Sequence, residues 1–202
     1  MSDHAHPQEA EPLEADDGAR EPELDPQVVA RRRAAIANIV QWGDPVLKSK
    51  ALPVGVFDDA LRAEIARMAG LMDDALGIGL ASNQIGRLRR LLVYKVEPDS
   101  PAQALVNPEI EWSSKLEEVF EEGCLSLQGV SVDVERPIHV RVRAQDGHGE
   151  WILVEASGLE ARVIQHEMDH LDGVLILDRA SREQRREAMR ALREQHAGDE
   201  AA

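Results

Sequence analysis

Residues 165–170 read Gln-His-Glu-Met-Asp-His, a pattern whose residue types and spacing suit metal chemistry. His166 and His170 are four residues apart, so on a helix they lie one turn apart on the same face, where both imidazoles can bind one divalent metal. Glu167 follows the first histidine and can act as a general base toward a metal-bound water. Gly173, just beyond the pattern, is a typical signal for the end of a helix. These residues therefore predict a helix that carries two metal ligands and a base.

The third ligand that a catalytic metal site normally needs is not part of this pattern. One class of metalloproteases continues the pattern with a further histidine, but the corresponding position here is Ile176. A second class takes a glutamate from a later helix, and Glu183 and Glu187 lie at a suitable distance along the chain. The chain's one cysteine, Cys124, is another candidate, because a thiolate and two imidazoles leave a fourth position open to water. The spacing alone leaves these candidates open.

Acidic residues are concentrated at the N-terminus. Residues 1–26 contain nine acidic residues and one arginine, a net charge of −8 out of −15 for the 202-residue chain. Large apolar side chains are scarce there, so this stretch cannot bury enough surface to offset the cost of ordering. We predict a disordered acidic tail over residues 1–26, a single domain over residues 27–195 and a flexible tail over residues 196–202. The rest of the chain is also acidic and only 3% of the residues are aromatic, which argues against a nucleic-acid site.

The sequence also bears on the compartment. One cysteine cannot form an internal disulfide, which fits a reducing compartment. The N-terminus is acidic and lacks the apolar core of a secretory signal, and no apolar run approaches the ~20 residues that a membrane helix needs. We therefore expect a cytoplasmic protein without a membrane segment.

Periodic patterns predict the helices that must position these groups. An amphipathic helix is expected after Asp58, ending at Gly77 and Gly79, because apolar residues recur at each turn: Leu61, Ile65, Met68, Met72 and Leu76. Further helices are predicted in three places: residues 27–40, residues 158–172, which carry both histidines, and residues 182–195.

Alternating or short apolar runs predict strands between these helices. They cover residues 91–94, 104–106, 109–112, 130–134, 138–142 and 151–154, with an Asp-Gly hairpin signal before the last of them. The strands are grouped together instead of alternating with helices. This order indicates an α+β fold with mostly antiparallel sheets.

The sequence resembles the peptide deformylase family in three motifs that occur in the family's order. They read Gly-Ile-Gly-Leu-Ala-Ser-Asn-Gln at residues 77–84, Glu-Gly-Cys-Leu-Ser at residues 122–126, and Gln-His-Glu-Met-Asp-His-Leu-Asp-Gly at residues 165–173. The likeness covers roughly residues 38–182. It implies mostly antiparallel sheets packed around a central metal-binding helix, with one further helix toward each end of the chain.

The resemblance implies a metal-dependent amide hydrolase that removes the N-formyl group from the formyl-methionine of newly made polypeptides and releases formate. Cys124, His166 and His170 would bind the metal, with Fe(II) as the physiological ion and Zn, Ni or Co as substitutes. Glu167 would take a proton from the metal-bound water that attacks the formyl carbonyl and pass it to the leaving amine. The implied partners are nascent N-formyl-methionyl peptides and, through the C-terminal helix, transiently the ribosome.

The same resemblance implies roles for residues outside the metal motif. The Gln84 side-chain amide and the Leu125 backbone N–H would stabilise the oxyanion that forms on the substrate carbonyl. Gly79 and Ile78 would offer backbone groups to an extended peptide that adds to them as a strand.

Supporting residues complete the expected site. Glu122 and Arg136 are expected to pair and brace the cysteine loop, and Asp169, next to a ligand on the helix, should point away from the metal. Ser82 and Gln128 depart from residues that are common in the family at these positions, and neither carries chemistry. We expect these departures to affect local loop shape and substrate preference.

Overall fold

The structure is a computed structural model that describes residues 25–199. In this range seven strands form two antiparallel sheets. The larger sheet has the order β1 (Gly79–Ala81), β2 (Leu91–Tyr94), β3 (Gln103–Ser113), β6 (His139–Gln145) and β7 (Trp151–Ser157), and the smaller sheet pairs β4 (Glu117–Cys124) with β5 (Leu127–Pro137). The predicted α+β class with mostly antiparallel sheets is confirmed.

Helices lie around these sheets, except for one helix that lies between them and is described below. They are α1 (Pro26–Ile36), α2 (Asp59–Asp74), α3 (Gly158–Leu171), α4 (Ile176–Arg179) and α5 (Arg182–Asp199), with the short 3-10 helices η1 (Pro45–Lys48) and η2 (Ser82–Ile85). None of the helices within the described range is long and apolar enough to cross a bilayer.

The two ends of the described range differ from the predicted tails. Asp25 caps α1 by accepting a hydrogen bond from the backbone N–H of Gln27 (2.7 Å), so the helix begins just inside the segment predicted to be a tail. The rest of that predicted tail, residues 1–24, lies outside the described residues. Helix α5 continues through Asp199, four residues beyond its predicted end, and residues 200–202 also lie outside the described part.

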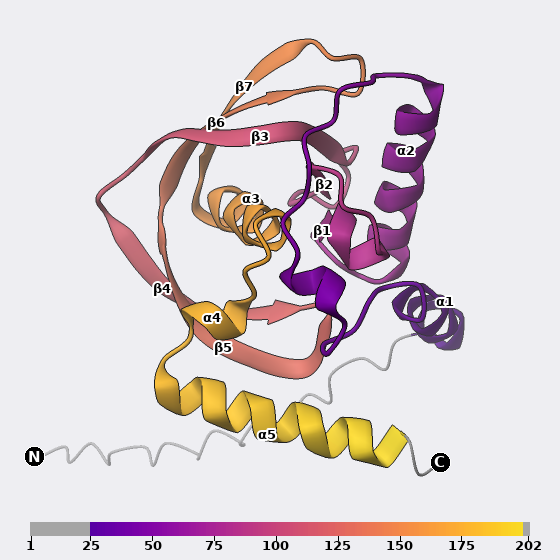
Figure 1. Cartoon of the computed structure of the whole chain (residues 1–202), viewed down its shortest axis with the longest axis vertical. Helices are drawn as coiled ribbons and strands as arrows, with labels where there is room; N and C mark the ends of the chain where they lie inside the picture. Colours follow the sequence, from indigo (N-terminus) through magenta and orange to yellow (C-terminus); the bar gives the residue numbers. More distant parts are fainter. Residues whose placement is uncertain (1–24, 200–202) are drawn as a thin grey trace, which may run out of the picture.

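Helix α3 is the exception, because it lies inside the fold and is enclosed by both sheets (Figure 1). Its side chains Ile164 and Leu171 are completely buried and pack in one cluster with Leu92 of β2 and Val142 of β6. Fully burying an apolar side chain of this size stabilises the fold by about 1.5–3 kcal/mol. The helix predicted to carry the metal ligands is therefore held firmly in the core.

The β4–β5 hairpin is inserted in the chain between β3 and β6, which pair with each other in the larger sheet. This insertion carries the end of β4 underneath α3 (Figure 1). Strand β4 was not predicted, because residues 117–122 are mostly acidic and lack a strand pattern. Its regular pairing with β5, from Glu117 opposite Pro137 to Gly123 opposite Ser131, makes it a strand despite its composition.

Helix α2 begins as predicted and ends earlier. The Asp58 side chain accepts a hydrogen bond from the Leu61 N–H (2.9 Å), but the helix stops at Asp74. Leu76 was predicted in the apolar stripe, and this is wrong, because it lies beyond the helix with φ +58° and is 52% exposed. The glycine that follows, Gly77, packs closely against Leu125: a Cβ there would lie 2.8 Å from Leu125 Cδ1, so that side chain would have to shift.

Candidate active site

Cys124, His166 and His170 come together although the cysteine is distant from the histidines in sequence. Their ligand atoms all lie within 4.8 Å of one another, close to the span that two metal–ligand bonds of about 2.0–2.3 Å allow. Cys124 Sγ lies 3.2 Å from His170 Nε2. Among the described residues this is the one such group of three His, Cys, Asp or Glu side chains. Glu183 and Glu187, the alternative third ligands, are exposed on α5.

The electrostatic surroundings of the two histidines fit a bound cation. Burial alone would lower the pKa of His166, but hydrogen bonds to Cys124 and Glu122 raise it well above its usual range. Surroundings that favour a protonated imidazole also favour a divalent cation at that imidazole. Burial lowers the pKa of His170 well below its usual range, so this ring stays neutral, as a metal ligand must be. The residues present therefore fit a divalent metal.

The carboxylate of Glu122 orients the His166 ring. Glu122 Oε2 lies 3.0 Å from His166 Nδ1 and 2.9 Å from Arg136 Nη2, and Oε1 lies 2.6 Å from Arg136 Nε and 2.8 Å from Arg162 Nη1. Four hydrogen bonds use all the acceptor positions of a carboxylate. Burial alone would raise the pKa of Glu122, but hydrogen bonds from Arg136 and His166 hold it well below its usual range. A charged Glu122 fixes the proton of His166 on Nδ1 and leaves Nε2 for the metal.

The predicted pairing of Glu122 with Arg136 is thus confirmed, and the same arginine reaches further. Arg136 Nη1 lies 2.8 Å from Asp169 Oδ2, and Asp169 also binds Arg179 at the end of α4. Asp169 therefore points away from the metal ligands, as expected. It ties α3 to β5 and to α4.

Glu167, between the two histidines, is buried beside them. Burial raises the pKa of its carboxyl to about 7, against the nearby positive charges of His166 and Arg136, which lower it. Its Oε2 is buried and has no hydrogen-bond partner among the described residues. An acceptor in this position is available to a water molecule or to substrate.

Gln84 reaches the same place from η2. Its Oε1 accepts a hydrogen bond from the Ala81 N–H (2.8 Å), which turns its Nε2 toward Ser126 Oγ (3.2 Å) and Cys124 Sγ (3.7 Å). The neighbouring Leu125 peptide is also held, because its carbonyl accepts a hydrogen bond from the side-chain amide of Gln128 (2.7 Å). The side-chain N–H of Gln84 and the backbone of Leu125 therefore flank the cysteine.

Strand β1 is an edge strand that pairs only with β2 in the described structure. The carbonyl of Ile78 already accepts a hydrogen bond from the Lys95 N–H (2.8 Å). Because residues along an antiparallel strand alternate between bonded and non-bonded pairs, the backbone groups of Gly79 face the free edge. Of the two residues expected to bind a peptide, Gly79 therefore has its backbone groups available, and Ile78 contributes a half-exposed side chain.

One cavity of about 550 Å³ is lined by Gly79, Gln84, Cys124, His166 and Glu167. Its buried floor contains Gln84 and Glu167, and its walls include exposed apolar residues, among them Phe120 and Leu159. A volume in this range is typical of pockets that enclose a small ligand or part of a chain.

A Gly79→Ala substitution is expected to damage activity more than stability. An added Cβ would lie 2.8 Å from Glu167 Cδ and 2.9 Å from its Cγ, so the carboxylate would have to move. The end of a flexible side chain can move at small cost in folding energy, but a displacement of about 1 Å in a reacting group can cost about 100-fold in rate. We expect kcat to fall by 10- to 100-fold with little change in melting temperature.

The matched control is Gly70→Ala, which adds the same methyl group within helix α2, where no heavy atom lies within 4 Å. It should leave kcat unchanged and raise stability by about 0.5–1 kcal/mol. A Gly79→Ala enzyme with the wild-type kcat would contradict the close contact with Glu167.

Two residues of the site were missed in the sequence. Arg162 lies one turn before His166 on α3 and, besides binding Glu122, donates to the backbone carbonyls of Val134 (2.9 Å) and Glu118 (2.7 Å). In the sequence, the one signal for this role was that Arg162 lies four residues before the predicted ligand His166. Asn83 donates from its side-chain amide to the carbonyl of His170, and no local pattern indicated this contact.

Comparisons with known proteins agree with this geometry. The polypeptide deformylase family model matches residues 36–186. The peptide deformylase of Acidothermus cellulolyticus is 45% identical over 160 residues, which is 79% of this chain and 87% of the relative. That of Thermotoga neapolitana is 47% identical over 138 residues, 68% of this chain and 83% of the relative. The crystal structure of a peptide deformylase from Legionella pneumophila has a TM-score of 0.75 at 37% identity and covers 81% of this chain and 97% of that one. The chain therefore belongs to the peptide deformylase family.

Proposed function

We propose that Cys124, His166 and His170 bind the metal of this deformylase and that Glu167 moves the proton during hydrolysis. The enzymes of this family are metal-dependent and remove the N-formyl group from nascent polypeptides, and the chain shares their sequence and fold. The observation that supports the assignment most strongly has two parts. The three ligand atoms lie within 4.8 Å of one another, and two of the ligand residues, Cys124 and His166, line the same cavity as Glu167 and Gln84.

The proposed steps follow from where these groups lie. A bound metal supplies a Lewis acid that polarises the formyl carbonyl and acidifies water. Glu167 accepts a proton from the attacking water at its unpaired Oε2 and delivers it to the amine nitrogen as the C–N bond breaks. Gln84 Nε2 and the Leu125 N–H donate to the oxygen on which negative charge develops. The products are formate and a peptide with a free α-amine.

The substrate would lie along the free edge of β1. The backbone N–H and carbonyl of Gly79 would pair with an extended peptide, which then runs outward from the buried floor. Ile78 would contact the peptide with its side chain, which is 45% exposed. In this arrangement the N-terminal residue of the substrate would lie at the metal ligands.

Formate release from formyl-Met-Ala by iron-loaded protein tests the proposal. Cys124→Ser should lose both metal and activity, because the third ligand is gone. A zinc endopeptidase that used Glu183 or Glu187 would keep both in this variant. Absence of formate from the wild-type reaction would contradict the deformylase assignment.

We propose Fe(II) as the metal in the cell, with Zn, Ni or Co as substitutes. One thiolate and two imidazoles can bind each of these ions, so availability and handling determine which is present. Protein purified without oxygen should contain iron, and it should lose activity in air as the ferrous ion or the Cys124 thiolate oxidises. Zinc as the metal after anaerobic purification, with activity insensitive to air, would contradict this choice.

We also propose that the enzyme acts in the cytoplasm and contacts the ribosome transiently through α5. This helix exposes a row of arginines that suits phosphate groups, namely Arg182, Arg185, Arg186, Arg190 and Arg193. Reversing the charge of three of them, at positions 185, 186 and 190, should abolish co-sedimentation with ribosomes. Unchanged co-sedimentation would exclude α5 as the contact.

A further inference from the structure

Helix α1 contributes a cation to the active-site cavity from outside the region that matches the family. The helix spans Pro26–Ile36, whereas the family match begins at residue 36. Arg32 of this helix lines the same cavity as Gln84 and Glu167. Because Arg32 is exposed and the floor residues are buried, its charge lies toward the open side of the cavity.

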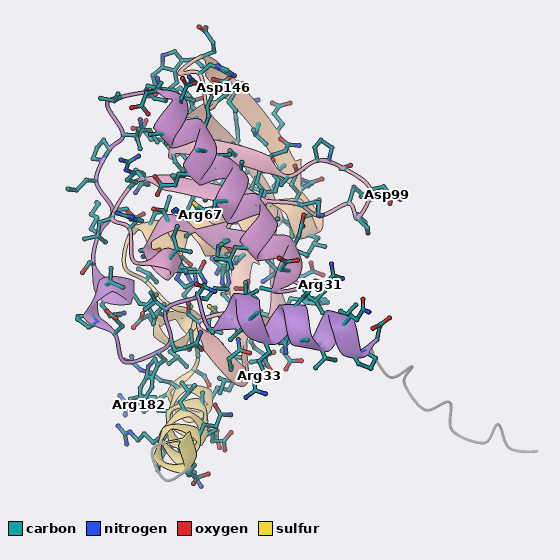
Figure 2. All side chains as sticks on the ribbon, turned by 90° about the vertical axis from the view of Figure 1, so that its right-hand side faces the viewer. Arg31, Arg33, Arg67, Asp99, Asp146 and Arg182 are labelled. Carbon is teal, nitrogen blue, oxygen red and sulfur yellow. The ribbon has the colours of Figure 1, made fainter. Side chains whose placement is uncertain are left out.

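Helical spacing explains why Arg32, and not a neighbouring arginine, reaches the cavity. Arg32 lies three and four residues before Ala35 and Ile36, so the three share one face of the helix. Ala35 is buried and Ile36 packs against the same cluster, which holds α1 on the protein body. Arg31 and Arg33 lie about 100° away around the helix on either side, and they project from opposite sides of it (Figure 2).

The charge of Arg32 is available to a ligand. Within residues 25–199 it forms no ion pair or side-chain hydrogen bond. The other arginine of the cavity, Arg162, is held by Glu122 and by two backbone carbonyls. Of the two guanidinium groups at the cavity, that of Arg162 is therefore paired within the protein and that of Arg32 is not paired within the described residues.

Two of the three carboxylates of the cavity, those of Glu122 and Glu167, are buried, and the third, that of Glu121, is exposed. The acceptor positions of Glu122 are filled by two arginines and a histidine, and Glu121 accepts a hydrogen bond from the Ser131 hydroxyl. Glu167 lies on the floor and acts there in the proposed reaction. Among the described residues, none of these carboxylates forms an ion pair with Arg32.

We propose that Arg32 binds an acidic side chain of the substrate peptide, downstream of the formyl-methionine. This inference rests on the proposed function, in which the formyl group lies at the floor and the peptide runs outward from Gly79. Each residue of an extended peptide advances the chain by about 3.3 Å, so the position that meets Arg32 is to be sought among the third to fifth residues. The planar fork of a guanidinium matches a carboxylate, so Arg32 selects for aspartate or glutamate at one of these positions.

Formyl-Met-Ala-Ala-Ala-Ala amide and its variants test the inference in the full-length, iron-loaded enzyme. The third, fourth and fifth residues are replaced one at a time by Asp, Asn or Lys, and the amidated end removes the terminal carboxylate. Wild-type kcat/KM should be about two- to fivefold higher for Asp than for Asn at one position, as for an exposed ion pair. Salt at about 0.5 M should reduce this ratio.

The variants then assign the preference to a residue. Arg32→Gln should bring the Asp-to-Asn ratio to one, and Arg32→Glu should shift the preference to Lys at the same position. Arg31→Gln, the matched control, removes an equal charge from the neighbouring position and should retain the ratio for Asp over Asn.

Three results would overturn the assignment. One is an equal wild-type kcat/KM for Asp and Asn at all three positions, and another is loss of the preference in Arg31→Gln. The third is a uniform rise in kcat/KM for all peptides in Arg32→Gln. That result would mean that Arg32 interacts with the acidic residues that precede α1 and not with the substrate. A wild-type enzyme that released formate from none of the peptides would instead refute the proposed function, and this inference with it.

Discussion

Glu167→Gln is expected to lower kcat by about two to four orders of magnitude, the usual contribution of a positioned general acid–base group. The amide has nearly the same shape as the carboxylate but cannot accept the proton of the attacking water. Glu167 lies on the buried floor of the cavity with one oxygen unpaired, whereas the neighbouring buried carboxylate, Glu122, already accepts four hydrogen bonds. KM should change much less than kcat, because the proposed peptide contacts at Gly79 are untouched. The measurement is formate release over a range of peptide concentrations.

Metal content separates this effect from loss of the site. Glu167 is not one of the three clustered ligands, so Glu167→Gln should retain about one equivalent of metal. Glu183→Gln removes one carboxylate from the exposed face of α5 and should behave like the wild type. A Glu167→Gln enzyme within tenfold of wild-type kcat would show that another group carries the proton.

Arg136→Ala is expected to produce the largest loss of stability. Its side chain is 2% exposed and makes two hydrogen bonds to Glu122 and one to Asp169. Removing one partner of a buried ion pair leaves the other charge unmatched, at a cost of about 3–5 kcal/mol. For a chain of this size that corresponds to a fall in melting temperature of about 6–20 °C. Thermal and urea unfolding of the metal-loaded enzyme would measure both quantities.

The same variant should weaken metal binding. Without Arg136, the carboxylate of Glu122 loses two of its four hydrogen bonds and orients His166 less firmly. Loss of such an outer partner typically costs 10- to 100-fold in metal affinity. Competition with a chelator measures this directly and does not depend on turnover.

Arg141→Ala is the matched control. Arg141 pairs with Glu155 at 2.6 Å between β6 and β7, but the two side chains are 46% and 67% exposed. Exposed pairs contribute about 0–1 kcal/mol, so this variant should unfold close to the wild type and bind metal normally. Equal melting temperatures for the two variants, or full metal affinity in Arg136→Ala, would refute the bracing role of Arg136.

Local spacing determined several features of this protein in advance. His166 and His170 were predicted as metal ligands and Glu167 as a base from a single helical turn, because that periodicity lies within five residues. The start of α2 at Asp58 and the buried strand β2 were predicted for the same reason, since capping and apolar runs are local signals. The end of α2 was predicted less well. A glycine was the predicted stop signal, whereas it is Leu76 that adopts the left-handed conformation, and Gly77 lies beside Leu125.

The resemblance to a family, and not spacing, singled out Cys124 as the third ligand, and the tertiary structure shows why it can serve. The β4–β5 hairpin carries the cysteine under α3, and Glu183 and Glu187 remain on the outside of the molecule. The acidic composition of β4 concealed it as a strand, because its conformation depends on pairing with β5.

The sequence by itself indicated two histidines as candidate metal ligands, proposed Glu167 between them as a base, and predicted the class of fold. Only the tertiary structure decided which distant side chains complete the site: Arg162 on Glu122, Asn83 on the His170 carbonyl and Arg32 at the open side of the cavity. The physical reason is that helical periodicity and capping act within a few residues and leave a pattern in the sequence. Contacts between segments far apart depend on how sheets and helices pack, and a carboxylate or guanidinium acquires its role only from the neighbours it meets there.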